Sequence, residues 1–288
     1  MTTSVSLQSD HLRCDLRPDL GGCIAGLWFD AIPVVRSSAA QDLRSVRDAG
    51  AFAMVPFSNR MAHATLQWAG TSHPLVQNKA DEPHAIHGVG WARPWDLLQA
   101  DADVALMSYE HKPDATWPFA FDASQAFRMH GNELELTLGI TNQSGQAAPV
   151  GLGWHPHFVK RARSRIAFAA SGRWEMDAQK LPTRRVPSSG LDAECRFLDV
   201  DHCFDGWGGV VQLRDELLHT RISSSLTRLV VYSNDRLDTL AIEPVSHVNN
   251  AINLSEAGSA AQQDLGVRVL QPGESMSAVM GIRVEAVK

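Results

Sequence analysis

Residues 132–141 read Asn-Glu-Leu-Glu-Leu-Thr-Leu-Gly-Ile-Thr, and an apolar side chain occupies every second position from Leu134 to Ile140. Alternation with a period of two places apolar side chains on one face of an extended chain and polar ones on the other, which is typical of a half-buried antiparallel strand. A looser alternation runs through residues 103–110 (DVALMSYE). These stretches predict antiparallel β-structure.

Short runs with strand-like composition recur along the rest of the chain, separated by clusters of Gly, Pro, Asn and Asp. They cover residues 3–8, 22–29, 64–69, 121–129, 165–169, 227–233, 239–243 and 276–284. Helical periodicity is scarce, and only residues 39–47 predict a short helix. Because parallel sheets need crossover helices, the pattern favours an all-β fold, a large antiparallel two-sheet β-sandwich.

The chain has 288 residues and contains no Gly/Ser/Pro-rich linker, low-complexity tract or repeat of fixed period. The most permissive breaks are residues 181–194 and 255–264, which we expect to form long loops. Strand-like segments of the same character flank both. We therefore expect residues 1–288 to form a single β-sandwich domain.

The formal net charge is −6, and no run is rich in Lys or Arg. This argues against nucleic acid or an anionic membrane surface as a partner and favours a small neutral or modestly charged ligand. Residues 1–15 lack the basic and apolar parts of a signal peptide, and no uncharged apolar stretch approaches the length of a membrane span. We expect a cytoplasmic protein.

The four cysteines, Cys14, Cys23, Cys195 and Cys203, show neither C-x-x-C spacing nor the density of a disulfide scaffold. They are predicted to be reduced, buried thiols. A zinc site made from Cys195, Cys203 and a distant His is an alternative that the spacing does not support.

Two segments in the first third of the chain concentrate polar and aromatic groups. In VPFSNR (residues 55–60), Pro56 ends a strand, which leaves Asn59 and Arg60 able to donate hydrogen bonds to a ligand. The alternative is a turn with a surface ion pair. HAIHGVGWARPW (residues 84–95) holds two His, two Trp and an Arg. Indole faces suit the C–H faces of sugars, although Trp residues are more often core.

Two further segments supply an acid and a base. In GLGWHPHF (residues 151–158), Pro156 restricts His155 to extended backbone, and an imidazole with a pKa near 6.5 suits general acid catalysis. Glu243 ends an apolar run in LAIEP (residues 240–244), where burial would raise its pKa toward that of a general base. The alternative for Glu243 is an ion pair with an arginine. Asp201 is either an acceptor for ligand hydroxyls or a turn residue.

Taken in chain order, these segments resemble the aldose 1-epimerase (galactose mutarotase) family. The resemblance runs from about residue 20 to about residue 283 and includes GGCIAGLWF (residues 21–29), VPFSNR, IHG followed by WARPW, GLGWHPHF, VDHCF (residues 200–204) and IEP. It implies a galactose mutarotase-like supersandwich that holds a sugar in an open groove and needs no cofactor or metal. The implied activity is interconversion of the α and β anomers of a free aldose.

The resemblance also assigns roles to residues. Glu243 would take the proton from the anomeric oxygen O1, and His155 would protonate the ring oxygen O5. His87 would hydrogen-bond the reacting oxygens. Arg60 and Asp201 would clamp sugar hydroxyls, and Asn59 would shape the pocket.

Some features depart from the family pattern. His157 stands where the family usually has an aromatic residue, and its role is a proton donor, a hydroxyl contact or a packed side chain; Trp154 is expected in the core. WARPW is closer to the broader superfamily than to the galactose-specific branch. One alternative, a related branch of the family, is a hexose-6-phosphate 1-epimerase, in which arginines hold the phosphate; Arg36 and Arg93 would be the candidates. Another is a non-catalytic carbohydrate-binding protein, which would not need both Glu243 and His155. We expect a small sugar as the partner, and a monomer or homodimer.

Overall fold

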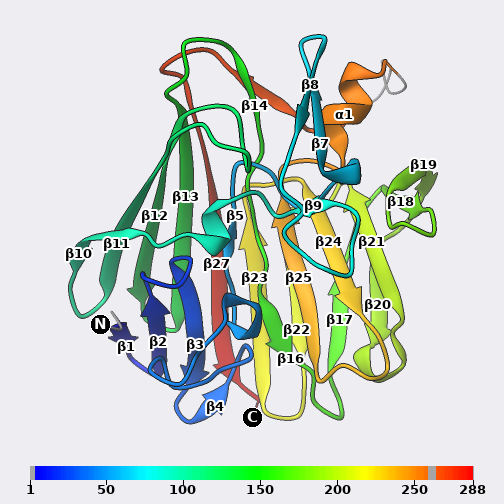
Figure 1. Cartoon of the computed structure of the whole chain (residues 1–288). Coiled ribbons are helices and arrows are strands. Elements are labelled where there is room, and N and C mark those ends of the chain that lie inside the picture. The colour runs from blue at the N-terminus through cyan, green and yellow to red at the C-terminus, as the bar shows by residue number, and fades with distance from the viewer. Residues whose placement is uncertain (1–3, 259–263, 288) are drawn as a thin grey trace.

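The computed structural model describes residues 4–258 and 264–287, and it consists mainly of two large antiparallel sheets packed face to face (Figure 1). One sheet has nine strands. In spatial order they are β10 (Asp96–Ala100), β11 (Val104–His111), β12 (Phe121–His130), β13 (Glu133–Asn142), β27 (Ser275–Ala286), β23 (Leu218–Ser224), β22 (Val210–Arg214), β17 (Arg165–Phe168) and β20 (Leu191–Glu194).

The second large sheet has eight strands and carries the candidate site. Its spatial order is β19 (Pro182–Pro187), β18 (Gly172–Met176), β21 (Val200–Asp205), β24 (Arg228–Ser233), β25 (Thr239–Val245), β15 (Gly153–Trp154) and β5 (Ala53–Met54), with β16 (His157–Val159) also paired to β25. All strand pairs in the described ranges are antiparallel. The predicted all-β fold class is therefore confirmed.

Smaller elements complete the described structure. A four-stranded sheet contains β1 (Val5–Ser9), β2 (Leu12–Arg17), β3 (Cys23–Phe29) and β4 (Ile32–Pro33). Three two-stranded ladders pair β6 (Arg60–Met61) with β9 (Ala85–Ile86), β7 (Thr65–Trp68) with β8 (Thr71–Pro74), and β14 (Ala148–Val150) with β26 (Arg268–Leu270). The helical elements are α1 (Ala251–Glu256) and the 3₁₀ turns Val46–Asp48, Ala62–Ala64, Gly90–Ala92 and Cys195–Phe197.

The alternating apolar side chains of β13 form part of the core between the two large sheets. Leu134, Leu136, Leu138 and Ile140 are each at most 2% exposed. They belong to the same buried cluster as Ile242 of β25, in the opposite sheet. Full burial of a Leu or Ile side chain contributes about 1.5–3 kcal/mol relative to exposure. The period-two pattern thus specifies which face of the sheet is buried.

The predicted helix at residues 39–47 is wrong, since only the 3₁₀ turn Val46–Asp48 forms there. Arg17 explains why the segment stays irregular. Its Nη1 group donates hydrogen bonds to the backbone carbonyls of Ala40 and Leu43, at 2.5 and 2.9 Å. These carbonyls therefore have a partner outside a helix, and the capping side chain of Ser45 starts only the 3₁₀ turn at the end of the predicted range.

The predicted loop at residues 181–194 is also wrong, because β19 and β20 occupy most of it. β19 pairs with β18, and β20 pairs with β17, so each strand is stabilised by a distant segment. Of the other predicted loop, residues 259–263 lie outside the described residues, as does residue 3 of the first predicted strand. Residues 255–256 of that loop belong to α1.

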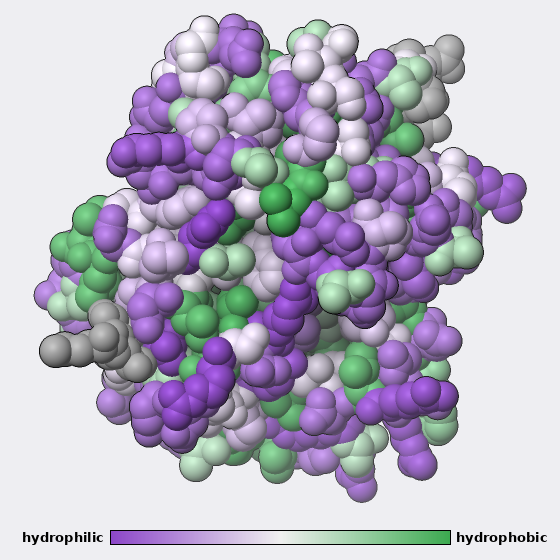
Figure 2. Space-filling model, viewed as in Figure 1, coloured by the Kyte–Doolittle hydropathy of each residue, from purple (hydrophilic) through white to green (hydrophobic). Residues whose placement is uncertain are grey.

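The helices of the described part are all too short or too polar to cross a membrane. Figure 2 shows that the face viewed in Figure 1 is mostly hydrophilic, with its apolar residues in small separate groups.

Candidate active site

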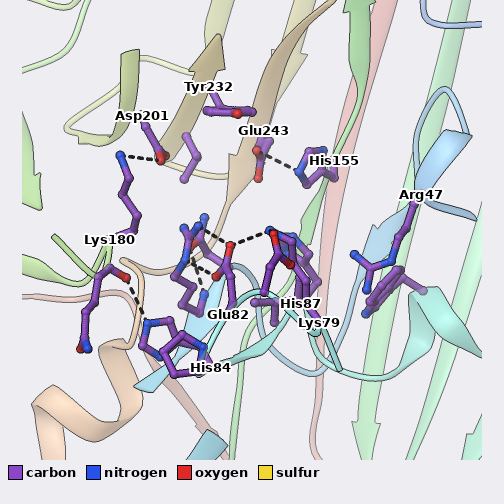
Figure 3. Close-up of a pocket in the computed structure, with 18 of the residues that line it drawn as sticks. Arg47, Lys79, Glu82, His84, His87, His155, Lys180, Asp201, Tyr232 and Glu243 are labelled. Carbon is purple, nitrogen blue, oxygen red and sulfur yellow. Dashed lines mark hydrogen bonds and ion pairs between the residues drawn. The ribbon is translucent and has the colours of Figure 1, made fainter. Parts of the chain in front are cut away.

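A pocket of about 690 Å³ opens beside the eight-stranded sheet, and side chains from distant parts of the chain converge in it (Figure 3). Its walls include all six residues to which the family resemblance assigns a role. These are Asn59, Arg60, His87, His155, Asp201 and Glu243. The structure therefore brings the predicted site residues together.

Strand register places His155 beside Glu243. Gly153 of β15 pairs with Val245 of β25, and His157 of β16 pairs with Ala241. His155 lies midway between Gly153 and His157, so it faces Glu243, which is midway between Ala241 and Val245. The His155 Nε2 atom is 3.3 Å from the Glu243 Oε1 atom, and the two side chains are 12% and 2% exposed.

Each member of this pair has a second polar atom without a hydrogen-bond partner among the described residues. These atoms are His155 Nδ1 and Glu243 Oε2, and both are buried. Buried polar atoms are normally hydrogen-bonded, and exceptions concentrate at sites with a functional role. The pair is therefore a candidate for chemistry rather than a satisfied structural ion pair.

Burial disfavours the charged form of both groups. It lowers the pKa of His155 to about 3. Burial also raises the pKa of Glu243 well above its usual value; the negative charge of Asp201 raises it further, and the positive charge of Arg60 opposes the rise. Burial therefore favours the neutral form of the pair, a carboxylic acid beside a neutral imidazole, over the ion pair.

His87 is held at the pocket by an unusual backbone turn. His87 and Gly88 have φ of +60° and +69°, and the His87 N–H donates to the Asn59 carbonyl at 2.8 Å. A Cβ on Gly88 would lie 2.3 Å from the Val55 carbonyl oxygen, so the turn requires glycine there. The rings of His87 and His155 are edge to face, with centroids 5.0 Å apart.

The His87 ring is neutral. Burial lowers its pKa well below the usual value, and a positive charge on His155 would lower it further. A neutral imidazole has one N–H donor and one acceptor nitrogen. Its Nδ1 atom is buried without a partner among the described residues, so His87 has hydrogen-bonding capacity left for a ligand.

Arg60 makes an ion pair, as one interpretation of its segment predicted. The ion pair lies in the wall of the pocket, however, and not on the outer surface. Its Nε and Nη2 atoms donate to the carboxylate of Glu82 at 2.7 and 2.9 Å, and both side chains are 15% exposed. The Asn59 side-chain oxygen accepts from the Arg60 backbone N–H at 2.9 Å. Asn59 thus orients Arg60. Glu82 was not predicted from the sequence, because a carboxylate in a polar segment resembles an ordinary solvated residue.

Asp201 lies on β21, directly across from Tyr232 of β24. Its carboxylate is 3.4 Å from the Lys180 Nζ atom, and all three residues line the pocket. Asp201 is therefore in a strand that faces the site, and the turn alternative is wrong. Tyr232 was not predicted from the sequence either, because only the strand register, in which Val230 pairs with Glu243, places Tyr232 two residues further along the same face.

The aromatic residues divide between pocket and core. Trp91 lines the pocket, and the Arg47 guanidinium carbon lies 4.9 Å from its ring centroid. Trp154 is 1% exposed and belongs to the core, as predicted. His157 lines the pocket with its ring centroid 4.5 Å from that of His155, and burial lowers its pKa to about 2.

The two arginines proposed to hold a phosphate do not line the pocket. Arg36 donates to the carbonyls of Ala49 and Arg47, at 2.7 and 2.6 Å from Nη2. Arg93 pairs with Asp114 at 3.2 Å on the surface. Neither guanidinium is placed as a phosphate clamp in the pocket, so this part of the alternative is wrong.

The cysteines are buried, free thiols, as predicted. Burial raises the pKa of Cys195 to about 11 and that of Cys203 to about 12, which disfavours the thiolate that zinc requires. Within residues 4–258 and 264–287, no group of three or more His, Cys, Asp or Glu side chains is arranged to hold a metal. The zinc alternative has no support in the described structure.

Known proteins resemble this chain in sequence and in structure over nearly its whole length. The family model for aldose 1-epimerase matches residues 3–283. The uncharacterised protein YphB of Escherichia coli K12 is 29% identical, over 98% of this chain and 99% of that protein. The crystal structure of a candidate aldose 1-epimerase from Escherichia coli K12 has a TM-score of 0.88 and 27% identity, and the match covers 100% of both chains.

More distant structures share the fold. A galactose mutarotase-like protein from Clostridium acetobutylicum has a TM-score of 0.83 at 19% identity, with 99% of this chain and 96% of that one covered. The family match spans nearly the whole sequence, and the fold agrees with it. The chain therefore belongs to the aldose 1-epimerase family.

Proposed function

We propose that this protein interconverts the α and β anomers of a free aldose, without a cofactor, by opening and reclosing the sugar ring. One observation carries the proposal: a buried imidazole and a buried carboxyl group lie 3.3 Å apart at a pocket large enough for a sugar. Family membership supports the same class of reaction. A protein that only binds sugars needs hydroxyl contacts but no such pair.

In the proposed reaction, the Glu243 carboxylate removes the proton from O1 while protonated His155 delivers one to O5. The C1–O5 bond breaks as the C1–O1 double bond forms, which gives the open aldehyde. Rotation about the C1–C2 bond presents the other carbonyl face. In reclosure O5 attacks C1, His155 recovers its proton from O5, and Glu243 returns one to O1. Concerted acid and base catalysis avoids a free charged intermediate.

The proton count of the pair fits this scheme. The neutral form of the pair, which burial favours, holds one proton, and transfer of that proton from the Glu243 carboxyl to the His155 imidazole produces the base and the acid together. The charge of Arg60 favours the ionised carboxylate. Sugar hydroxyls that hydrogen-bond Glu243 would favour it further. No proton from bulk water is needed in either direction, which suits a freely reversible reaction.

The remaining pocket residues have binding roles in this proposal. Neutral His87 donates to or accepts from the reacting oxygens, because its ring lies against that of His155. Arg60 donates to sugar hydroxyls, and Asp201 accepts from them. These contacts fix the sugar so that O1 and O5 face Glu243 and His155, which is the positioning that makes the two proton transfers efficient.

A sugar panel tests the proposal. Purified protein is added to freshly dissolved α-anomers of galactose, glucose, arabinose and xylose, and to glucose 6-phosphate, and equilibration is followed by polarimetry or saturation-transfer NMR. We expect acceleration with at least one free aldose. Acceleration with glucose 6-phosphate alone would favour the phosphosugar alternative. Sugar binding without acceleration of any sugar would favour the non-catalytic binding protein.

A further inference from the structure

The carboxylate of Glu82 accepts two hydrogen bonds from one edge of the Arg60 guanidinium. Nε and Nη2 of Arg60 donate to the two oxygens of Glu82 at 2.7 and 2.9 Å, and Nη1 donates to the Asn59 side-chain oxygen at 3.3 Å. A guanidinium has five N–H groups. Two of them, one on each terminal nitrogen, remain uncommitted among the described contacts and are available to a ligand in the pocket.

Glu82 is itself tied into the pocket wall. The Lys79 ammonium donates to Glu82 Oε1 at 2.8 Å, and the Gln77 side-chain amide donates to the Glu82 carbonyl. The Asn78 side chain exchanges two hydrogen bonds with the Ile86 backbone, at 2.8 and 2.9 Å. Ile86 pairs with Arg60 in the β6–β9 ladder. The wall segment 77–82 and the Arg60 side chain are therefore fastened to the same two-stranded ladder.

We propose that Glu82 is a positioning residue for the sugar: it holds the Arg60 guanidinium in the orientation that binds sugar hydroxyls. This inference rests on the proposed function. Two parallel N–H···O bonds fix the plane of the guanidinium as well as its location, which a single contact does not do. Without Glu82, Arg60 loses a fixed rotamer and must be ordered when the sugar binds, so affinity falls.

The charges around Glu82 favour its ionised form, which is the form that holds the Arg60 guanidinium. Burial raises its pKa, but hydrogen bonds from Arg60 and then Lys79 outweigh burial and lower the pKa to about 2. The carboxylate is therefore ionised at neutral and mildly acidic pH. Glu82 also offsets the positive charge of Arg60, which lowers the pKa of Glu243. Removing the Glu82 charge should thus shift the acid limb of the pH–rate profile to lower pH.

The test compares Glu82→Gln with a matched control, Glu175→Gln. Glu175 accepts two hydrogen bonds from Arg173, at 3.0 and 2.8 Å, but lies outside the pocket. KM and kcat for mutarotation are measured with the best free aldose, and the sugar Kd is measured by isothermal titration calorimetry. Loss of a charge-assisted bidentate contact predicts a KM and Kd about 10-fold to 100-fold higher in Glu82→Gln, with kcat within about threefold of wild type.

Two further variants show whether Glu82 acts through Arg60. Glu82→Asp should recover part of the affinity, because it keeps the charge. In an Arg60→Met background, Glu82→Gln should have almost no additional effect on Kd. The inference is overturned if Glu82→Gln binds sugar like wild type, if Glu175→Gln weakens binding equally, or if the Arg60 and Glu82 effects add. A wild-type protein that neither binds nor equilibrates any sugar would overturn the proposed function, and the inference with it.

Discussion

The Nε2 atom of His155 lies 3.3 Å from the Oε1 atom of Glu243, although the two residues come from segments far apart in the chain. The contact follows from antiparallel pairing of β15 and β16 with one strand, β25. Glu243 sits in a strand whose seven residues are all buried. Sheet pairing therefore supplies both the proximity of the acid and base and the low-polarity surroundings that change their pKa values.

The buried histidines predict that the protein loses stability in mild acid. Burial lowers the pKa of His155 to about 3 and that of His247 to about 4. As the pH falls below about 6.5, the unfolded chain binds protons at these sites and the folded chain does not, so unfolding becomes more favourable. Each site should cost about 2 kcal/mol of unfolding free energy between pH 6.5 and 5. Urea denaturation at both pH values measures this; equal midpoints would contradict it.

Glu243 predicts the opposite pH dependence. Its pKa is raised in the folded protein, so the stability that comes from the neutral carboxyl is present at low pH and is lost as the pH rises. Glu243→Gln keeps the shape of the side chain but has no charge to bury. The variant should therefore unfold at a higher temperature than wild type, with an advantage that is larger at pH 8.5 than at pH 5. Thermal unfolding at both pH values measures it, and a variant less stable at pH 8.5 would contradict the prediction.

Gly88→Ala should distort the turn that carries His87. The new Cβ would lie 2.3 Å from the Val55 carbonyl oxygen, so the backbone must shift. We expect a loss of at least about 2 kcal/mol in unfolding free energy together with a large drop in mutarotation rate. Gly70→Ala is the matched control, because Gly70 has a similar φ, +74°, but nothing within 4 Å of the added atom. Its cost should be about 1 kcal/mol, with activity retained; equal effects of both variants would contradict a steric cause.

The single-domain organisation remains a prediction. The largest buried cluster contains Leu7 of β1, Leu136 of β13 and Ile242 of β25, so early, middle and late segments share one core. We therefore expect one cooperative unfolding transition, with equal calorimetric and van't Hoff enthalpies. Two resolved transitions in a calorimetric scan would contradict this expectation.

Much of the fold can be predicted from local sequence patterns, because burial of one face of a sheet requires apolar residues at alternate positions of its strands. The run from Leu134 to Ile140 is the clearest case. Residues 182–187 of β19 show no such alternation of apolar residues and are mostly exposed, so only the pairing with β18 specifies this strand. Arg17 similarly decides the conformation of residues 40–43 from a distance.

The candidate site divides in the same way. His155, His87 and Glu243 stand next to Pro or Gly residues that mark unusual backbone, so their segments are conspicuous in the sequence. Glu82 also precedes a proline, Pro83, but its importance comes from a contact with Arg60 that local sequence does not encode. The contact between His155 and Glu243 also required the fold, since register alone brings them together.

The most direct test of the account is the rate of anomeric exchange at saturating sugar in Glu243→Gln and His155→Asn, measured by saturation-transfer NMR, with sugar Kd measured alongside. We expect each variant to bind sugar within about fivefold of wild type but to exchange the anomers at least about 100-fold more slowly, because each lacks one of the two proton-transfer groups. Wild-type exchange rates in either variant would contradict the assignment of Glu243 as the base and His155 as the acid.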